Sequence, residues 1–534
     1  MKSKYNHPSS YLSAVLASGI KELFAIDAEA TVESTDRRFG DFQSNAALQL
    51  QKELQRAPRD IAKELAEYLS NIKEVAEAEV AGPGFINITL SDDYWLQFMS
   101  NLSDDFGYHE SPEQSEKVQV EFISANPTGP LTLGNARGGF IGDVLSNVLD
   151  TQGYDVTREY YFNDAGTQVS KLLESVKVEA GLLEVEDRQY SGEYISKLAQ
   201  DFKEKLTTED DATLKKLLTK TIFTEYIQPD IKKMNIEFDE WFNETSLIED
   251  GSFDATMDIL REKGLLFERD GAQWLNTERG GDPRRERVFI KSNGDPSYFA
   301  PDVAYHVNIF SQRRFDRAIK ELGPDHVAQF PSVRAVISLL YPDKKLEMVT
   351  HQQLRLIKNG QEFKMSKRSG QYVTVGELID RVGADVARWF MLMRSSDTHM
   401  DFDLDLAEEQ SQKNPFWYVM YAYVRLNAIL RQAREREINS ASEMTTIAPI
   451  EKEMIKQIAL LPDLLDTVSR TYEVHKLTFY GQEFARLFHE WYEEIHVLDL
   501  PQNDAAQKLY MLEKIKKMFE NYFEIIGIEP LESM

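Results

Sequence analysis

Three kinds of hydrophobic pattern divide the chain along its length. In the first part, residues 41–56 and 59–80 have the spacing of apolar positions that predicts helices. Residues 80–90 contain a Gly-Pro-Gly turn followed by the alternation typical of a strand. A polar run, residues 103–117, ends this region. We therefore predict a small α+β domain over residues 1–112.

The middle of the chain begins with a strand–turn–helix–strand pattern. Residues 118–124 alternate as a strand does, and residues 124–139 form a turn rich in glycine and proline. A helical pattern over 140–154 and a second strand over 155–162 follow. Such a βαβ unit implies a parallel sheet, with its ligand crevice at the carboxyl ends of the strands. We predict a Rossmann-like domain over residues 113–405.

Beyond this domain the pattern is helical only. Residues 412–437, 450–470 and 475–498 have the spacing of long, aromatic-rich amphipathic helices. We predict an all-α bundle over residues 406–534. The expected fold class is multidomain α/β, in which a Rossmann-like parallel-sheet core lies between an N-terminal α+β domain and a C-terminal all-α bundle.

Composition limits the classes of protein that fit this pattern. The chain is 42% hydrophobic and 28% charged, as folded domains are. No run of ~18 apolar residues and no apolar leader is found, so we expect a cytoplasmic protein without a membrane span. With 0 cysteines, disulfides, thiolate zinc sites and cysteine nucleophiles are excluded. The net charge of −28 argues weakly against a nucleic-acid partner.

The Gly-rich turn is the first segment with candidate chemistry. Gly129, Gly134, Gly138 and Gly139 allow the backbone to approach a ligand closely. The helix that follows directs its first amides at any anion bound there. Taken alone, this pattern fits phosphate binding and a tight structural turn equally well.

The second such segment contains the string Lys364-Met365-Ser366-Lys367. Several cations on a short loop before a helix can hold a polyphosphate and neutralise charge that develops during a reaction. A lysine-rich loop alone is usually plain surface. The literal KMSK string downstream of the Gly-rich turn favours the catalytic interpretation.

Both segments resemble the class I aminoacyl-tRNA synthetases, and within them the arginyl-tRNA synthetases. Residues 120–145 and 158–168 resemble the region of that family's HxGH motif. Residues 80–90 resemble its N-terminal tRNA-binding appendage, and residues 414–425 the start of its helical anticodon-binding domain. The further blocks that match, in order before KMSK, are residues 238–247, 296–306 and 322–330.

The resemblance implies an arginine–tRNA ligase. In that reaction the arginine carboxylate attacks the α-phosphorus of ATP, and a ribose hydroxyl of tRNA(Arg) then attacks the arginyl-adenylate. It implies ATP and Mg²⁺ as cofactors, L-arginine and tRNA(Arg) as partners, no membrane and a monomer. Residues 1–112 become a tRNA-binding domain, 113–405 the catalytic domain and 406–534 an anticodon-binding domain.

The resemblance also assigns single residues. Carboxylates suit arginine because its guanidinium is a planar fork of donors. The arginine-binding positions are Glu121, Ser124, Asn126, Glu244, Tyr298, Asp302 and Gln329. The ATP-binding positions are Pro127, Gly129, Gly134, Asn135, Gly138, Met365, Ser366 and Lys367. The catalytic positions are Lys364, Lys367, Asn135 and Thr132. No protein metal ligand is expected, and His306 and His326 are interpreted as structural.

The chain departs from the family in the HxGH motif itself. Both histidine positions are changed, to Thr132 and Asn135. Losing one donor to a transition state costs roughly 10²–10³ in rate. We interpret the change as tuning, because the glycines and the KMSK string are kept.

Two alternatives stay open at this point. A synthetase for another amino acid is disfavoured by Tyr298, Asp302 and Glu244, because three polar groups suit a cationic side chain. A catalytically silent paralogue that binds tRNA is disfavoured by the retained KMSK string. If tRNA is bound, Tyr421 or Arg425 is expected near the start of the last domain.

Overall fold

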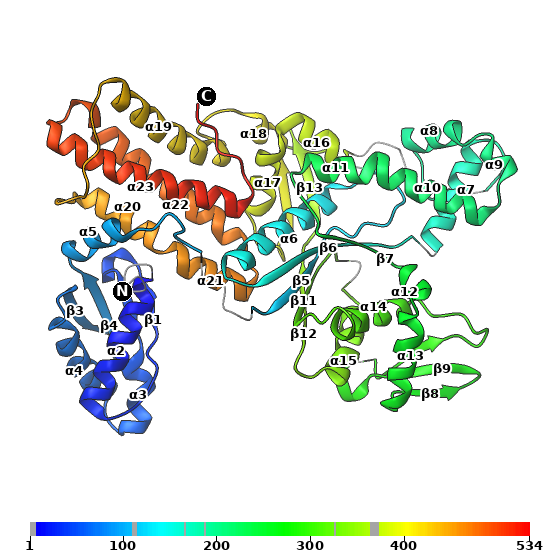
Figure 1. Cartoon of the computed structure of the whole chain (residues 1–534), viewed down its shortest axis with the longest axis horizontal. Helices are drawn as coiled ribbons and strands as arrows, with labels where there is room; N and C mark the ends of the chain where they lie inside the picture. Colours follow the sequence, from blue (N-terminus) through cyan, green and yellow to red (C-terminus); the bar gives the residue numbers. More distant parts are fainter. Residues whose placement is uncertain are drawn as a thin grey trace. The chain divides into compact units, whose positions relative to one another are not determined.

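The structure is a computed structural model of the 534-residue chain. Its contacts divide the chain into two compact units, whose elements are labelled in Figure 1. It describes residues 7–108, 115–164, 167–185, 188–282, 284–324, 327–363 and 373–533. The first unit comprises Met1–His109, Ser411–Thr471 and Lys476–Met534, and the second Glu110–Gln410 and Tyr472–His475. The predicted boundary at residue 113 lies outside the described residues.

A five-stranded parallel sheet forms the centre of the second unit, with the strand order β12-β11-β5-β6-β7. From β5 the chain proceeds to β6 and β7 on one side, whereas β11 and β12 lie on the other. The order therefore reverses between β5 and β11, and a ligand crevice is expected at the carboxyl ends of these two strands. The strands are β5 (Lys117–Glu121), β6 (Asp155–Phe162), β7 (Glu240–Asn243), β11 (Arg317–Leu322) and β12 (Lys345–Thr350).

Helices and two smaller sheets surround this sheet (Figure 1). Before β11 the helices are α6 (Leu133–Thr151), α7 (Thr167–Glu179), α8 (Glu193–Asp201), α9 (Lys205–Thr208), α10 (Asp211–Ile222), α11 (Gln228–Lys233), α12 (Ser246–Glu249), α13 (Ser252–Glu262) and α14 (Phe299–Ser311). After β11 they are α15 (Phe330–Leu340), α16 (Val375–Val382), α17 (Ala384–Leu392) and α18 (Leu404–Glu408). The smaller sheets are made of β8 (Leu266–Arg269), β9 (Ala272–Asn276) and β10 (Glu286–Ile290), and of β13 (Leu354–Lys358), β14 (Gln361–Glu362) and β15 (Met400–Asp403).

The first unit combines both ends of the chain. Its N-terminal part has a four-stranded antiparallel sheet in the order β1-β2-β4-β3, and its C-terminal part is helical. The N-terminal elements are α2 (Pro8–Phe24), β1 (Val32–Ser34), β2 (Phe42–Ser44), α3 (Ala46–Leu54), α4 (Pro58–Ser70), β3 (Val75–Ala81), β4 (Phe85–Leu90) and α5 (Asp92–Asn101). The C-terminal helices are α19 (Pro415–Glu435), α20 (Pro449–Ala459), α21 (Leu461–Thr471), α22 (His475–Glu494) and α23 (Gln502–Ile526).

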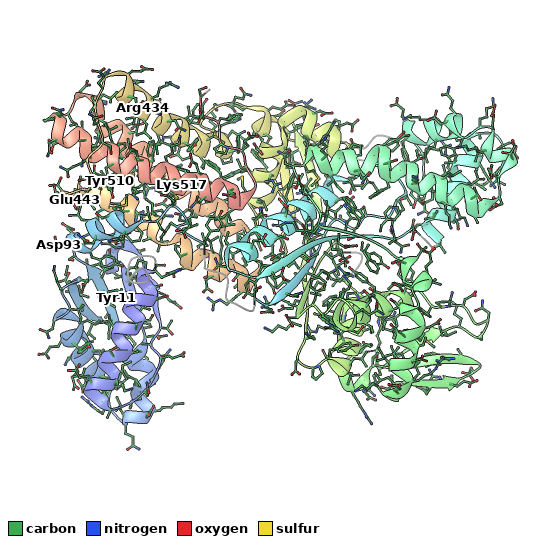
Figure 2. The ribbon with its side chains drawn as sticks, in the orientation of Figure 1. Tyr11, Asp93, Arg434, Glu443, Tyr510 and Lys517 are labelled. Carbon is green, nitrogen blue, oxygen red and sulfur yellow. The ribbon has the colours of Figure 1, made fainter. Side chains whose placement is uncertain are left out.

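Polar contacts join the two ends within this unit. Lys452 of α20 pairs with Asp92 at the start of α5 at 2.7 Å. On α23, which carries Tyr510 and Lys517 in Figure 2, Asn521 Nδ2 donates to the carbonyl of Phe106 at 3.2 Å. A carboxylate and carbonyls of the N-terminal part are thus satisfied by side chains from helices more than 300 residues away in sequence.

The predicted fold class is confirmed, with four local corrections. The turn predicted over 124–139 is too long, because α6 begins at Leu133, where Thr132 caps it. Residues 59–80 are not one helical region, because α4 ends at Ser70 and Val75–Ala81 forms β3. The alternation of that segment suits a strand, and β4 provides its antiparallel partner. Residues 41–56 begin with a strand, β2, before α3. Residues 450–470 divide into α20 and α21 around Leu460, next to Pro462.

None of the helices in the described part of the chain is long and apolar enough to cross a membrane.

Candidate active site

The turn after β5 has an unusual backbone. Ile123 and Ser124 have φ values of 65° and 35°, and such values are costly for a β-branched residue such as isoleucine. The next strand fixes this conformation, since Ser124 Oγ accepts from the Tyr161 amide at 3.1 Å and Tyr160 Oη donates to the Ala125 carbonyl at 2.9 Å. A strained, over-determined backbone at the carboxyl end of a central strand is typical of a functional site.

The changed motif residues pair with each other at the start of α6. Thr132 is the N-cap, and its amide donates to Asn135 Oδ1 at 2.9 Å. Thr132 Oγ1 lies 2.8 Å from the same oxygen and accepts from the Asn135 amide at 3.4 Å. This reciprocal capping box satisfies two amides that a helix start otherwise leaves open. Within the described part of the chain, the amides of Leu133 and Gly134 have no hydrogen-bond partner.

The glycines near this turn make room for different neighbours. A Cβ on Gly138 would lie 2.2 Å from Glu321 Oε2, and one on Gly129 would lie 3.1 Å from the Tyr194 ring. At both positions the close neighbour is a protein side chain. A Cβ on Gly134, in contrast, would meet no atom closer than 3.7 Å. Of these three predicted ATP-binding glycines, only Gly134 has space beside it.

Asp302, in the first turn of α14, is held by several side chains. Gln329 Nε2 donates to Asp302 Oδ2 at 2.8 Å, which brings together two residues predicted to bind arginine. His306 Nδ1 lies 2.7 Å from the Asp302 carbonyl and 3.3 Å from its carboxylate. Burial alone would raise the pKa of Asp302, but Lys320 and His306 hold this pKa well below its usual value. The carboxylate is therefore ionised at neutral pH.

A buried lysine links Asp302 to Glu121. Lys320 Nζ, on β11, lies 3.2 Å from Glu121 Oε2 and 3.8 Å from Asp302 Oδ1. It also lies 5.1 Å from the centre of the Tyr305 ring. Burial disfavours the charged lysine, but Glu121 and Asp302 outweigh burial and raise the pKa of Lys320. Glu121 and Asp302, which are both predicted to bind arginine, thus share the positive charge of Lys320.

Glu121 also belongs to a second buried group of charged and polar side chains, which surrounds the Tyr305 hydroxyl. Tyr305 Oη lies 2.9 Å from Glu121 Oε2 and also contacts Glu159, which pairs with Arg313. Gln119 Nε2 donates to the same hydroxyl at 2.8 Å. Burial, with these two carboxylates, raises the pKa of Tyr305 well above the ordinary tyrosine value. Each buried charge of this layer has a partner, as a buried polar network requires.

Glu244 and Tyr298 complete the predicted arginine set. Glu244 accepts from Tyr161 Oη at 2.5 Å, and burial raises the pKa of its carboxyl group. Asp302 adds to that shift, so the two carboxylates act on one another. Tyr298, the N-cap of α14, is 71% exposed. The structure thus gathers Glu121, Glu244, Tyr298, Asp302 and Gln329, while Asn126 and Pro127 lie in the turn after β5.

Some predicted residues lie outside the described part of the chain. They are Lys364, Met365, Ser366, Lys367 and His326.

Sequence reasoning missed several members of the site. Lys320, Glu321 and Glu159 lie on strands of a parallel sheet, where hydrophobic residues are the rule. Charged residues inside such strands are a usable signal that they serve the carboxyl edge of the sheet. Tyr161 and His351 carry no comparable signal.

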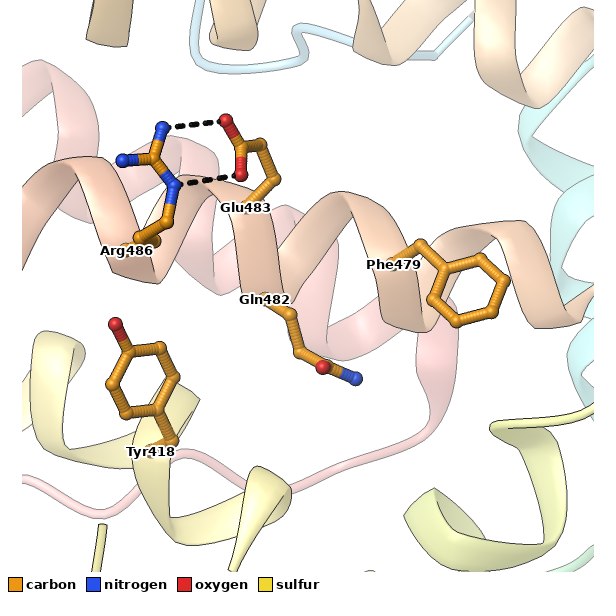
Figure 3. Close-up of a pocket in the computed structure, with 5 residues that line it drawn as sticks. All are labelled: Tyr418, Phe479, Gln482, Glu483 and Arg486. Carbon is orange, nitrogen blue, oxygen red and sulfur yellow. Dashed lines mark hydrogen bonds and ion pairs between the residues drawn. The ribbon is translucent and has the colours of Figure 1, made fainter. Parts of the chain in front are cut away.

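The helical part of the first unit contains a hollow of about 310 Å³ (Figure 3). Tyr418 of α19 faces Phe479, Gln482, Glu483 and Arg486 of α22 across it. Arg486 Nη2 donates to Glu483 Oε1 at 2.8 Å, so its charge is largely balanced.

Near this hollow, Arg425 extends from α19 toward α22. Arg425 Nη1 lies 3.0 Å from His489 Nδ1, and its guanidinium carbon lies 4.9 Å from the centre of the Tyr492 ring. Arg425 thus stacks on an aromatic ring of the bundle itself. Tyr421, the alternative residue, is half-buried on α19.

Comparison with known proteins identifies the family. Residues 10–90 match the arginyl tRNA synthetase N terminal domain, 97–407 the class I (R) tRNA synthetase catalytic domain, and 419–534 the DALR anticodon binding domain. The Arginine--tRNA ligase of Bacillus velezensis is 36% identical over 548 residues, covering 98% of this chain and 97% of the relative.

Further comparisons agree with this assignment. The Arginine--tRNA ligase of Bacillus subtilis is 37% identical over 548 residues, again covering 98% of this chain and 97% of the relative. The solved Thermus thermophilus arginyl-tRNA synthetase has the same fold, with a TM-score of 0.78 and 18% identity, covering 98% of this chain and 100% of that one. The resemblance noted in the sequence is confirmed, and the chain belongs to the arginyl-tRNA synthetase family.

Proposed function

We propose that this arginine–tRNA ligase activates L-arginine with ATP at the carboxyl edge of its parallel sheet and then transfers it to tRNA(Arg). The observation that carries the assignment of this site is the cluster of Asp302, Gln329 and Glu121 around Lys320. These residues come from β5, β11, α14 and the start of α15, and they converge where the strand order reverses.

Asp302, Glu244 and Tyr298 receive the guanidinium in this proposal. Arginine selection requires fixed acceptors, and the ionised Asp302 carboxylate is held in place by Gln329. Glu244 is held by Tyr161 Oη at 2.5 Å. Two oriented carboxylates match the donor fork of arginine, whereas the single ammonium of lysine would leave acceptors unpaired.

The other end of the amino acid meets the strained turn. Glu121, Ser124, Asn126 and Gln329 bind the α-amino and α-carboxylate groups in this proposal. Positioning is the main task here, because the attacking group is the substrate's own carboxylate and the protein forms no covalent bond.

ATP binds along the start of α6 in this proposal. The open amides of Leu133 and Gly134 lie at the positive end of a 19-residue helix, where phosphate oxygens are stabilised. Pro127, Gly129 and Gly138 shape the turn, and Thr132 and Asn135 hold the helix start. Lys364, Met365, Ser366 and Lys367, from the segment outside the described residues, complete the ATP site, and the two lysines neutralise the leaving pyrophosphate.

Mg²⁺ enters this site with ATP. In the described part of the chain, no group of three or more His, Asp or Glu side chains could hold a metal ion. Mg²⁺ is usually bound by substrate phosphates, waters and one or two carboxylates rather than by an all-protein cage. When bound, it would neutralise phosphate charge during attack on the α-phosphorus.

The terminal domains bind tRNA in this proposal. We keep the predicted division into 1–112, 113–405 and 406–534, with the first and last parts acting as one RNA-binding body. The contacts that join α5 to α20 and α23 support this joint action. Tyr418, Phe479 and Gln482 around the hollow offer stacking and hydrogen-bonding groups for an unpaired base. We further propose that the chain acts as a monomer in the cytoplasm.

Exchange of labelled pyrophosphate into ATP tests this function. The full chain is assayed with each of the 20 amino acids, with and without tRNA(Arg). The proposal predicts exchange with arginine alone. Exchange with another amino acid would identify a synthetase of different specificity, and no exchange with any amino acid would identify a silent tRNA-binding paralogue.

A further inference from the structure

His351 is fixed at the edge of the sheet where the ligand crevice is expected. It follows β12 directly, and its amide donates to the Leu322 carbonyl of β11 at 3.2 Å. The carbonyl of the next residue, Gln352, accepts from Nη1 of the fully buried Arg137 of α6 at 2.8 Å. The backbone that carries the imidazole is thus tied to β11 and α6 before any ligand binds.

Glu321 sets the orientation of the ring. Its carboxylate contacts His351 Nδ1, and both side chains are buried, at 4% and 9% exposed. Gly138 leaves room for this carboxylate, because a Cβ there would lie 2.2 Å from Glu321 Oε2. A carboxylate at Nδ1 holds a hydrogen on that nitrogen and fixes the orientation of the ring. Nε2 is therefore the atom that can meet a ligand.

Nε2 faces two glycines of the crevice. It lies 3.9 Å from the position that a Cβ on Gly134 would take, and 3.7 Å from that of a Cβ on Gly323. Gly134 carries one of the open amides of α6, and Gly323 follows β11. Within the described ranges, Nε2 has no hydrogen-bond partner. A ring nitrogen is thus held beside two positions that carry no side chain.

The α6 turn itself offers no such group. The side chains of Thr132 and Asn135 are neutral, and their oxygens are used in the capping box. His351, although it comes from a different strand, is therefore the described side chain that presents a ring nitrogen beside Gly134.

We propose that His351 is an ATP-contacting residue of this enzyme, forming a hydrogen bond through Nε2 with the ribose–triphosphate part of ATP, and that Glu321 is its positioning residue. This inference rests on the proposed ATP site at the start of α6. The turn before α6 has no histidine at either HxGH position. In this chain His351, held by Glu321, supplies a ring nitrogen there instead.

Kinetics of His351→Ala test the contact in the full chain. Arginine attachment to tRNA is measured while ATP and arginine are varied separately. Because removing one preorganised hydrogen-bonding group costs about 10²–10³-fold, kcat/KM for ATP should fall about 10²-fold, while KM for arginine changes less than about threefold. His399→Ala, which removes an exposed histidine of the same unit, should behave like the wild type.

The positioning role of Glu321 has its own readout. Glu321→Gln removes the charge beside Nδ1 and should lower kcat/KM for ATP about tenfold, without changing KM for arginine. Combined with His351→Ala it should cause no further loss, because a positioning residue acts only through the ring. Additive losses in the double variant would overturn this role.

A rescue experiment separates the contact from a structural effect. Introducing Thr132→His into the His351→Ala variant should recover at least about tenfold of the lost kcat/KM for ATP. Failure to recover activity, with the fold intact by circular dichroism, would overturn the claim that His351 replaces a ring nitrogen of the turn. If kcat/KM fell equally for ATP and for arginine and the Tm were lowered, His351 would have only a structural role.

Calorimetric titration with ATP and with adenosine locates the contact and does not depend on charging activity. Weaker binding of ATP alone in His351→Ala places the contact on the phosphates, and weaker binding of both places it on the ribose. Unchanged binding of ATP would overturn the proposal. Wild-type protein that binds ATP but exchanges pyrophosphate with no amino acid would contradict the proposed function and leave the His351 contact standing.

Discussion

Two buried aspartates, one in the arginine-binding cluster and one beside the start of α6, have opposite pKa shifts. Asp302, at the arginine end, is held ionised by Lys320 and His306, which lower its pKa. Asp230, which accepts from the Leu131 amide at 3.3 Å just before α6, has its pKa raised to about 6, mainly by burial. The arginine end thus stabilises buried charge by providing counter-charges, whereas at Asp230 burial outweighs the Leu131 amide and Lys233, so this carboxyl group keeps its proton to a higher pH.

This difference follows from what each end must bind. Arginine brings a cation, so the protein needs fixed carboxylates and must stabilise them while the site is empty, as Lys320 does for Glu121 and Asp302. ATP brings several negative charges, so a carboxylate close to α6 needs a partner, as Glu321 has in His351. The capping pair of Thr132 and Asn135 gives the helix start its shape without adding charge.

Removing the shared cation should have the largest effect. Lys320→Met leaves Glu121 and Asp302 buried without their partner, and breaking a buried pair from one side costs about 3–5 kcal/mol. The unfolding free energy in urea should fall by this amount at pH 7 and recover partly near pH 4, where the carboxylates take up protons. Lys291→Met, at an exposed lysine, is the matched control. A change within about 0.5 kcal/mol, which is the size of a surface effect, would show that Lys320 does not hold the cluster.

Asp302→Asn tests the arginine end without removing a cation. A guanidinium that loses its buried charged partner binds more weakly by about 2–5 kcal/mol, so KM for arginine should rise strongly while KM for ATP stays unchanged. Asp295→Asn, at an exposed aspartate just before α14, serves as control. An unaltered arginine KM would remove Asp302 from the site.

Asp230→Asn tests the other end through pH dependence. Because the folded pKa of about 6 lies above the unfolded value of 3.8, the folded chain retains a proton that the unfolded chain releases between these pH values. The stability of wild-type protein should therefore fall as pH rises from 4 to 6, by up to about 3 kcal/mol. Thermal unfolding of Asp230→Asn between pH 4 and 7.5 should lack this fall, and Asp343→Asn, at an exposed site, should keep it.

The smallest effect is expected at the cap of α6. Thr132→Ala removes the hydroxyl that accepts from the Asn135 amide, which costs about 1 kcal/mol, whereas Thr132→Ser keeps the cap. Amide hydrogen exchange in the first turn of α6 should be faster in the alanine variant only. Equal exchange in both variants would mean that Asn135 alone fixes the helix start.

Local sequence patterns predict single elements better than they predict contacts between distant parts of the chain. The strands β5 and β6 follow from local alternation and match the structure closely, whereas the glycine-rich stretch predicted as a turn includes the first turns of α6, which begins at Leu133. The segment 75–81 is harder to predict, because its alanine and glutamate residues favour a helix by propensity while their alternation and the pairing with β4 make it a strand. Residues far from their partners in sequence were missed. Glu321 and His351 meet only because β11 and β12 are neighbours in the sheet.

The central claim is that paired carboxylates at the arginine end select a guanidinium by its charge. Citrulline tests this directly, because it replaces one guanidinium nitrogen by oxygen and is neutral with nearly the same shape. Transfer of labelled arginine and labelled citrulline to tRNA(Arg) should give kcat/KM values that differ by at least about 10³-fold in the wild type. The ratio should shrink at least tenfold, a change of about 1.4 kcal/mol, in Asp302→Asn. Comparable use of the two amino acids by the wild type, or an unchanged ratio in the variant, would contradict the account.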